Sequence, residues 1–74
     1  MAIHLGGYGF ELVDDGTLDT VIEVLDPVSG DTREYRYSQE FAATYRDTDG
    51  ALDLFAFCEE VVYDDVADDE EWAI

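Results

Sequence analysis

Two segments of the chain, 8–13 and 32–37, alternate in side-chain character with a period of two, the pattern of a half-buried β-strand, and the segment between them is rich in β-branched residues, which also favour a strand. Strands are therefore expected over residues 8–13, 20–26 and 32–37. The last two flank Asp26-Pro27-Val28-Ser29-Gly30-Asp31, a turn signal in which proline fixes φ and glycine permits a positive φ. The apolar spacing over 18–25 also fits a helical stripe, but this turn favours a β-hairpin over residues 20–37. The glycines at 6, 7 and 9 are expected to leave the first residues flexible.

Two helices are expected after the hairpin. Ser38 is a suitable N-cap for a short helix over 39–46, which the sequence Asp47-Thr48-Asp49-Gly50 would end. A main helix is predicted over 51–63. A strand over 52–58 is the competing interpretation, because that stretch is short and apolar. The helical interpretation places four residues on one apolar face: Leu52, Phe55, Cys58 and Val62.

Together these elements predict one small domain over residues 1–74. The expected fold is α+β, with a three-stranded antiparallel sheet and two or three short helices packed on one of its faces. The C-terminal segment 65–74 is strongly acidic, and it is expected either to form a short terminal helix or to be a mobile tail.

The net charge of the chain is unusually negative for a domain of this size. The 74 residues hold 20 Asp and Glu against three Arg and no Lys, a formal net charge of −17. A magnitude of about 2–8 is sufficient for the solubility of a small domain. The excess is largest in residues 38–74, which carry −11 against −6 in residues 1–37. With 47% hydrophobic residues the chain can still fold. Nucleic acid and anionic membranes would repel it, so the expected partner is a basic surface.

The sequence offers little for catalysis or metal binding. Its only histidine, His4, lies near the N-terminus, and its only cysteine, Cys58, lies in an apolar run that favours a small buried side chain. Around Gly50, Asp47 and Asp49 fit two positions of a calcium-binding EF-hand loop, but Tyr45 and Ala56 occupy the two end positions, where carboxylates are needed. We therefore expect neither an enzyme nor a cofactor or metal site.

The acidic residues of the C-terminal half are the candidate partner-binding residues. On a helix over 51–63, Asp53, Glu60 and Asp64 would lie within about 40° of one another, and the acids that follow extend this row. Such a row resembles the phosphates along a nucleic acid strand, whereas the alternative is an ordinary solvated helix face. The candidates are Asp49, Asp53, Glu59, Glu60, Asp64, Asp65, Asp68, Asp69, Glu70 and Glu71. Exposed Tyr or Trp side chains among them would suit an interface.

A short hairpin followed by helices rich in Asp and Glu resembles the small acidic DNA mimics that phages and mobile elements encode. In size and charge the chain is most similar to the anti-CRISPR proteins. The resemblance rests on general character over the whole chain and on the acids listed above, since such proteins share no signature motif. It implies a monomeric inhibitor that occupies the DNA-accepting surface of a CRISPR effector, specifically a type I-C Cascade-type complex. The expected location is the cytoplasm, that of the host cell if a phage encodes the protein.

A second interpretation explains the charge by adaptation to high salt. The chain has no lysine, and its 12 Asp exceed its 8 Glu, a composition typical of haloarchaeal proteins. Molar salt would screen the repulsion between the acids. The chain would then be a small regulatory or toxin–antitoxin domain. Its nine Phe and Tyr residues and one Trp argue against this alternative, because salt-adapted proteins often have fewer large apolar side chains.

Overall fold

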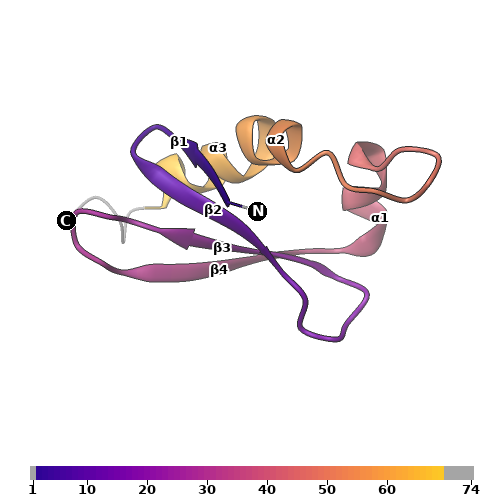
Figure 1. The fold of residues 1–74 in the computed structure, drawn as a ribbon, viewed down its shortest axis with the longest axis horizontal. Coiled ribbons are helices and arrows are strands. Elements are labelled where there is room, and N and C mark those ends of the chain that lie inside the picture. The colour runs from indigo at the N-terminus through magenta and orange to yellow at the C-terminus, as the bar shows by residue number, and fades with distance from the viewer. Residues whose placement is uncertain (1, 70–74) are drawn as a thin grey trace.

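The computed structural model describes residues 2–69 of the chain. They form an α+β fold in which helical segments cover one face of a four-stranded antiparallel sheet (Figure 1). The strands neighbour one another in the order in which they follow along the chain. This confirms the α+β class and all three expected strands, including the hairpin. The strands are Ala2–Leu5 (β1), Tyr8–Val13 (β2), Thr20–Leu25 (β3) and Thr32–Tyr37 (β4).

The expectation of a three-stranded sheet is wrong, because residues before β2 form the additional strand β1. Gly6 and Gly7, expected to be flexible, instead make a two-residue turn in which Leu5 pairs with Tyr8. Their φ angles are +57° and +86°, and a type I′ hairpin turn needs such positive values at both central positions. Gly6 is also required by packing, because a side chain there would collide with the ring of Tyr63.

The first expected helix begins where the sequence indicates. Ser38 is its N-cap, and the Ser38 Oγ accepts a hydrogen bond from the Phe41 backbone N–H at 3.2 Å. The segment is α-helical over Gln39–Ala42 (α1) and then tightens into a 3₁₀ turn over Ala43–Tyr45 (η1). A loop with Gly50 at φ +83° follows, and an isolated bridge between Arg46 and Leu52 closes that loop.

The main helical run covers residues 54–68, so the predicted bounds of 51–63 are wrong at both ends. It consists of Leu54–Phe57 (α2), a π-helical stretch over Cys58–Val62 (η2) and Tyr63–Asp68 (α3). The run starts late because Asp53 is the N-cap, accepting a hydrogen bond from the Ala56 backbone N–H at 3.2 Å. The competing strand over 52–58 is also wrong, since only Leu52 forms a bridge. Of the two alternatives for the segment 65–74, a short terminal helix or a mobile tail, residues 65–68 follow the helical one as part of α3, while residues 70–74 lie outside the described residues.

The core lies between the sheet and this helical run. Phe10, Ile22 and Val24 project from the sheet, and Phe57 and Cys58 meet them from the helix, all with no exposed area. Around Phe57 the rings of three further aromatic residues pack with centroid distances of 5.0–6.3 Å, in edge-to-face geometry. These residues are Tyr37, Phe41 and Tyr45.

The predicted apolar face of the helix is partly wrong. Phe55 is 52% exposed, and Phe57 occupies the core in its place. The buried positions Leu54, Cys58, Val62 and Val66 recur every four residues. In a regular α-helix such a series drifts around the axis by about 40° per step. The wider π turn at η2 reduces this drift, which keeps the later residues directed at the sheet.

Cys58 is the small buried residue that the sequence predicted. It is fully buried in the core, and burial raises the pKa of its thiol to about 11. The thiol therefore remains protonated at neutral pH and lacks the thiolate that nucleophilic chemistry requires.

The assignment of Phe57 to the core and Phe55 to the surface can be tested with a matched pair of variants. Phe57→Ala is expected to lower the free energy of unfolding by about 3–5 kcal/mol, because it removes a fully buried ring and leaves a cavity. Phe55→Ala, on the same helix, should lower it by less than about 1 kcal/mol. Urea denaturation followed by circular dichroism measures both. Equal losses in the two variants would contradict the observed helix phase.

Candidate protein-binding surface

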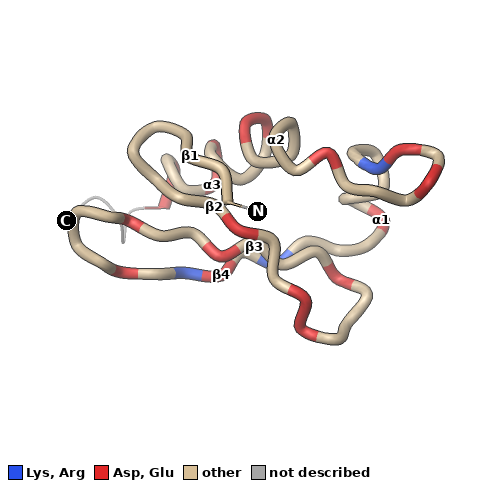
Figure 2. Tube along the Cα trace, in the orientation of Figure 1, with Lys and Arg blue, Asp and Glu red and all other residues tan. Residues whose placement is uncertain are grey.

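The acids predicted to bind a partner gather mainly on the helical run. Figure 2 shows acidic positions over the whole length of the domain, including the helices. We define the acidic helix surface as Glu59, Glu60, Asp64, Asp65 and Asp68, all of which are exposed. Asp69 follows as the C-cap of α3 and Asp53 precedes as the N-cap of α2. The predicted residues Glu70 and Glu71 lie outside the described residues.

Asp49 and Asp53 stand apart from this surface. Asp49 lies at the tip of the loop between η1 and α2, where its backbone N–H donates to the Asp47 carboxylate at 2.9 Å. In Figure 2 this loop forms one end of the molecule, away from α3. Asp53 is committed to capping α2. The structure therefore does not bring Asp49 together with the acids of the helix.

Tyrosine hydroxyls hold the helix acids against the body of the domain. Tyr37 on β4 donates to Asp65 Oδ2 at 2.6 Å, and Tyr35 donates to Asp69 Oδ2 at 2.7 Å. Tyr45 at the end of η1 forms a third such hydrogen bond, with Glu60. These three residues thus bond successive carboxylates along the helical run without adding a positive charge. The carboxylates keep their negative charge and gain a fixed position.

The environment of these tyrosines disfavours their ionised form. Burial, followed by the hydrogen bond to Asp65, raises the pKa of Tyr37 far above its ordinary value of 10.0. The hydrogen bond to Glu60 and burial also raise the pKa of Tyr45. An ionised tyrosine would repel the neighbouring carboxylate, and it would have no hydroxyl proton to donate to that carboxylate. Both side chains therefore act as neutral donors.

The π-helical stretch lies within the acidic helix surface. Glu59 and Glu60 are part of η2, and the Tyr63 backbone N–H bonds to the Cys58 carbonyl five residues before it. Such π segments are rare and occur frequently at functional sites. Here η2 has a packing role, because Cys58 and Val62 are buried while the two glutamates between them are exposed.

The density of charge approaches that of a nucleic acid. Eighteen of the 20 acids and all three arginines lie within residues 2–69, which gives a net charge of −15 for that part of the chain. The domain is elongated, with extents of 39 × 22 × 21 Å. Along its longest axis it therefore carries one net negative charge per about 2.6 Å. Duplex DNA carries one per about 1.7 Å.

A second acidic group lies on the opposite face of the sheet. Glu11, Glu23 and Glu34 are direct cross-strand neighbours on β2, β3 and β4. We call them the glutamate row. Their side chains point away from the helices, because the residues next to them in sequence, including Phe10 and Ile22, point into the core. Like charges directly opposite each other destabilise a sheet, so this arrangement works against the fold.

Sequence reasoning missed the glutamate row although the signal was present. The predicted turn centred on residues 28 and 29 already sets Glu23 opposite Glu34 in the hairpin. What the sequence did not supply was the register of β2 against β3, which places Glu11 opposite Glu23. The connecting segment 14–19 has no regular secondary structure from which that register follows.

Arg36 stabilises the end of the same sheet face. Its guanidinium bonds to Asp15 at 2.6 Å and to Asp19 at 3.2 Å, and it also donates to Thr17 Oγ1 at 3.3 Å. Hydrogen bonds from Thr17 and Arg36 lower the pKa of Asp15 to about 2. The cluster fixes the loop between β2 and β3. Val21, which pairs with Arg36 on this face, is buried.

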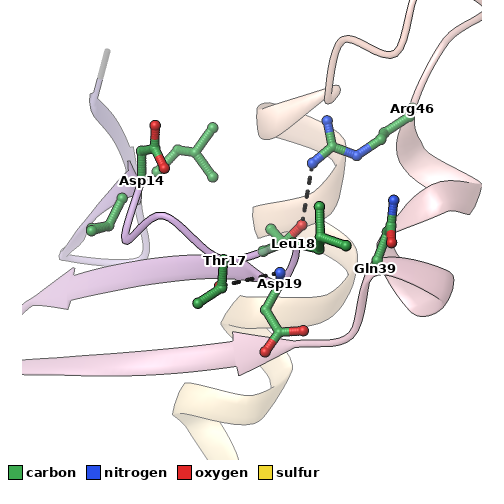
Figure 3. A pocket seen from close by; sticks show the side chains of 9 residues that line it. Asp14, Thr17, Leu18, Asp19, Gln39 and Arg46 are labelled. Carbon is green, nitrogen blue, oxygen red and sulfur yellow. Dashed lines mark hydrogen bonds between the residues drawn. The ribbon is translucent and has the colours of Figure 1, made fainter.

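An open hollow of about 360 Å³ lies where this loop meets α1 and the end of η1. Leu12 and Leu18 line it together with Gln39 and Arg46. Figure 3 shows the guanidinium of Arg46 at the hollow, where it bonds to Thr20 Oγ1 at 3.4 Å. A second hydrogen bond, to the Gly50 carbonyl at 2.7 Å, ties Arg46 to its own loop. These contacts give Arg46 a structural role.

Two further observations concern only residues 2–69. No group of three or more His, Cys, Asp or Glu side chains in that part of the chain is arranged to hold a metal ion. None of its helices has both the length and the apolar character needed to cross a membrane.

The chain matches no protein-family model, no curated protein and no solved structure at a significant level. Inference about its function therefore depends on its own residues and geometry.

The tyrosine–carboxylate contacts predict a loss of stability at alkaline pH. Because folding raises the pKa of Tyr37 and Tyr45, their contribution is complete below the ordinary tyrosine pKa of about 10 and is lost as the pH rises above it. Urea unfolding at pH values from 8 to about 11 should show this decline. Tyr37→Phe should lower stability at pH 8 by about 0.5–1.5 kcal/mol and should reduce the alkaline decline. A decline of unchanged size in Tyr37→Phe would contradict the assignment.

The glutamate row predicts that removing its central charge stabilises the protein. Glu23→Gln is expected to raise the free energy of unfolding by about 0.5–1 kcal/mol, since it relieves repulsion with both cross-strand neighbours. Glu59→Gln, which changes the net charge equally on the helix, is the control and should have a smaller effect. Thermal melting at low salt measures both. A destabilised Glu23→Gln variant would contradict the repulsion.

Proposed function

We propose that this protein is a non-enzymatic DNA mimic, which inhibits a nucleic-acid-binding protein by occupying the Lys- and Arg-lined groove that receives DNA. The observation that carries the proposal is the acidic helix surface, where neutral tyrosines and not cations hold two of the five exposed carboxylates, those of Asp65 and Glu60. Arginine partners would have fixed the same carboxylates equally well but would have cancelled the negative field.

The charge density supports the same proposal. One net charge per about 2.6 Å of length is within a factor of two of duplex DNA. A field of this strength attracts a basic groove over several ångströms and accelerates encounter. Fixed carboxylates then pair with the lysines and arginines that normally bind phosphates. Because their positions are set before binding, less side-chain entropy is lost when the complex forms.

A CRISPR effector of the Cascade type is the target we propose, on the strength of the resemblance to small acidic anti-CRISPR proteins. The inhibitor would act in the cytoplasm, where such complexes bind target DNA. The 39 Å length of the domain corresponds to about 11 steps of duplex at 3.4 Å per step. This is long enough to block a substantial part of a DNA-binding channel.

Charge-neutral variants test which acids make the contact. Glu59→Gln, Asp64→Asn and Asp68→Asn combined should weaken binding to a purified Cascade-type complex by about tenfold or more, if each charge contributes about 0.5 kcal/mol. The matched control combines Asp14→Asn, Asp31→Asn and Glu40→Gln, three exposed acids spread over other parts of the domain. It should weaken binding by less than about threefold. Biolayer interferometry at two salt concentrations gives the affinities.

Equal losses in both triple variants would contradict a defined role for the acidic helix surface. Failure of the folded protein to bind the complex at low salt would contradict the proposed target. A chain that folds cooperatively only as salt approaches molar concentration would support salt adaptation in place of mimicry. A cooperative melt at about 0.1 M salt, where the Debye length is about 10 Å, would contradict that alternative.

A further inference from the structure

No helix covers one face of the sheet, although Val21 at the end of that face is only 1% exposed beside Arg36 and the loop that Arg36 holds. All helical segments lie on the other side (Figure 1). The open face carries the glutamate row across its middle, with Leu25 on one side of the row and the pair Val13 and Val21 on the other. Leu25 is 39% exposed and Val13 is partly buried. This face therefore presents three carboxylates next to an exposed apolar side chain, Leu25.

Within residues 2–69, the two arginines on β4 are not placed to neutralise the glutamate row. Arg36 shares this face, but its guanidinium is engaged by Asp15 and Asp19 at the end of the sheet. Arg33 pairs with Val24, so its side chain starts on the face that the helices cover. A partner that complements the charge of the row would have to be positively charged.

The spacing of the row indicates the form of that partner. Neighbouring strands lie about 4.8 Å apart, so the three glutamates advance by that distance per step and span about 9.6 Å. Residues three or four apart on an α-helix have Cβ atoms about 5–6 Å apart. Cations at positions i, i+4 and i+7 of a helix span about 10.5 Å along its axis. A helix laid across β2, β3 and β4 would thus place one cation on each glutamate.

We propose that the open face of the sheet docks a basic α-helix of a partner protein, with Lys or Arg at i, i+4 and i+7 over Glu11, Glu23 and Glu34. The aliphatic parts of those cations would pack on Leu25 and Val13. This inference rests on the proposed function for the sign of the partner's charge, but it concerns a different face from the acidic helix surface. The inhibitor would then contact basic elements on two sides.

A peptide titration tests the inference without any effector complex. The probe is an alanine-based helical peptide with arginines at i, i+4 and i+7, and its isomer has the same composition with arginines at i, i+5 and i+10, which are spread around the helix at about 100° per residue. Chemical shifts of the ¹⁵N-labelled full chain report the position and affinity of binding. The largest shifts are expected in β2, β3 and β4, and the isomer should bind about fivefold more weakly or worse.

Two triple variants complete the test. Glu11→Gln, Glu23→Gln and Glu34→Gln combined should weaken binding of the probe about tenfold, whereas Glu59→Gln, Asp64→Asn and Asp68→Asn, with the same change in net charge, should weaken it less than about threefold. The sheet variant should remain folded, because it removes repulsion between strands. Equal losses in both variants, equal affinity of the two peptides, or shifts centred on the helices would overturn the inference. No effector complex is present in this titration. A negative result here therefore does not contradict the proposed DNA mimicry, and failure to bind an effector does not contradict the docking of a basic helix on the sheet.

Discussion

The rest of this structure depends on one constraint. The acidic helical run has to be attached to the sheet without positively charged partners. The run carries five exposed acids, and the chain has only three arginines with which to pair them. Two interactions replace ion pairs. The ring of Phe57 packs among Tyr37, Phe41 and Tyr45 in the core, and tyrosine hydroxyls bond to the helix carboxylates. Tyr37 and Tyr45 take part in both, so packing and charge placement are coupled through the same side chains.

This solution leaves the domain acidic on two opposite sides. The acidic helix surface lies on one side and the glutamate row on the other, with the sheet and core between them. Arg36 pairs with Asp15 and Asp19 in the loop between β2 and β3. Arg46 donates hydrogen bonds to the Gly50 carbonyl in its own loop and to Thr20. Both arginines therefore stabilise connections between elements, while neither pairs with an acid of the two candidate surfaces. A chain selected only for stability would distribute its few cations differently, because opposed glutamates and clustered helix acids repel each other.

The sequence allowed the main features of the fold to be predicted where local signals were strong. Alternation and the turn around Pro27 and Gly30 gave the hairpin, and Ser38 gave the start of α1. The strand β1 escaped prediction because Gly6-Gly7 indicates both flexibility and a tight hairpin turn, and only pairing with β2 distinguishes the two. The phase of the main helix was missed at its start because Leu54, Phe55 and Phe57 are all apolar, and their spacing does not show which of them faces the sheet.

The candidate surfaces, like the fold, could be predicted from the sequence only in part. The acids of the helix could be listed from sequence, since their number alone made them conspicuous. Their tyrosine partners could not, because Tyr35 and Tyr37 are 34 and 28 residues away from the acids they bond. Likewise the glutamate row depends on strand register, a property of the folded sheet that one-dimensional spacing leaves open across the loop 14–19. Tertiary contacts, and not local propensity, thus decide which acids are held in place.

Competition with DNA tests the central claim most directly. The apparent dissociation constant of a purified Cascade-type complex for its target duplex would be measured at several fixed concentrations of this protein, at low salt. A DNA mimic predicts that the apparent constant rises in proportion to the protein concentration, while saturating DNA restores full occupancy. An apparent constant that stays unchanged, or a reduced maximum occupancy that excess DNA does not restore, would contradict mimicry.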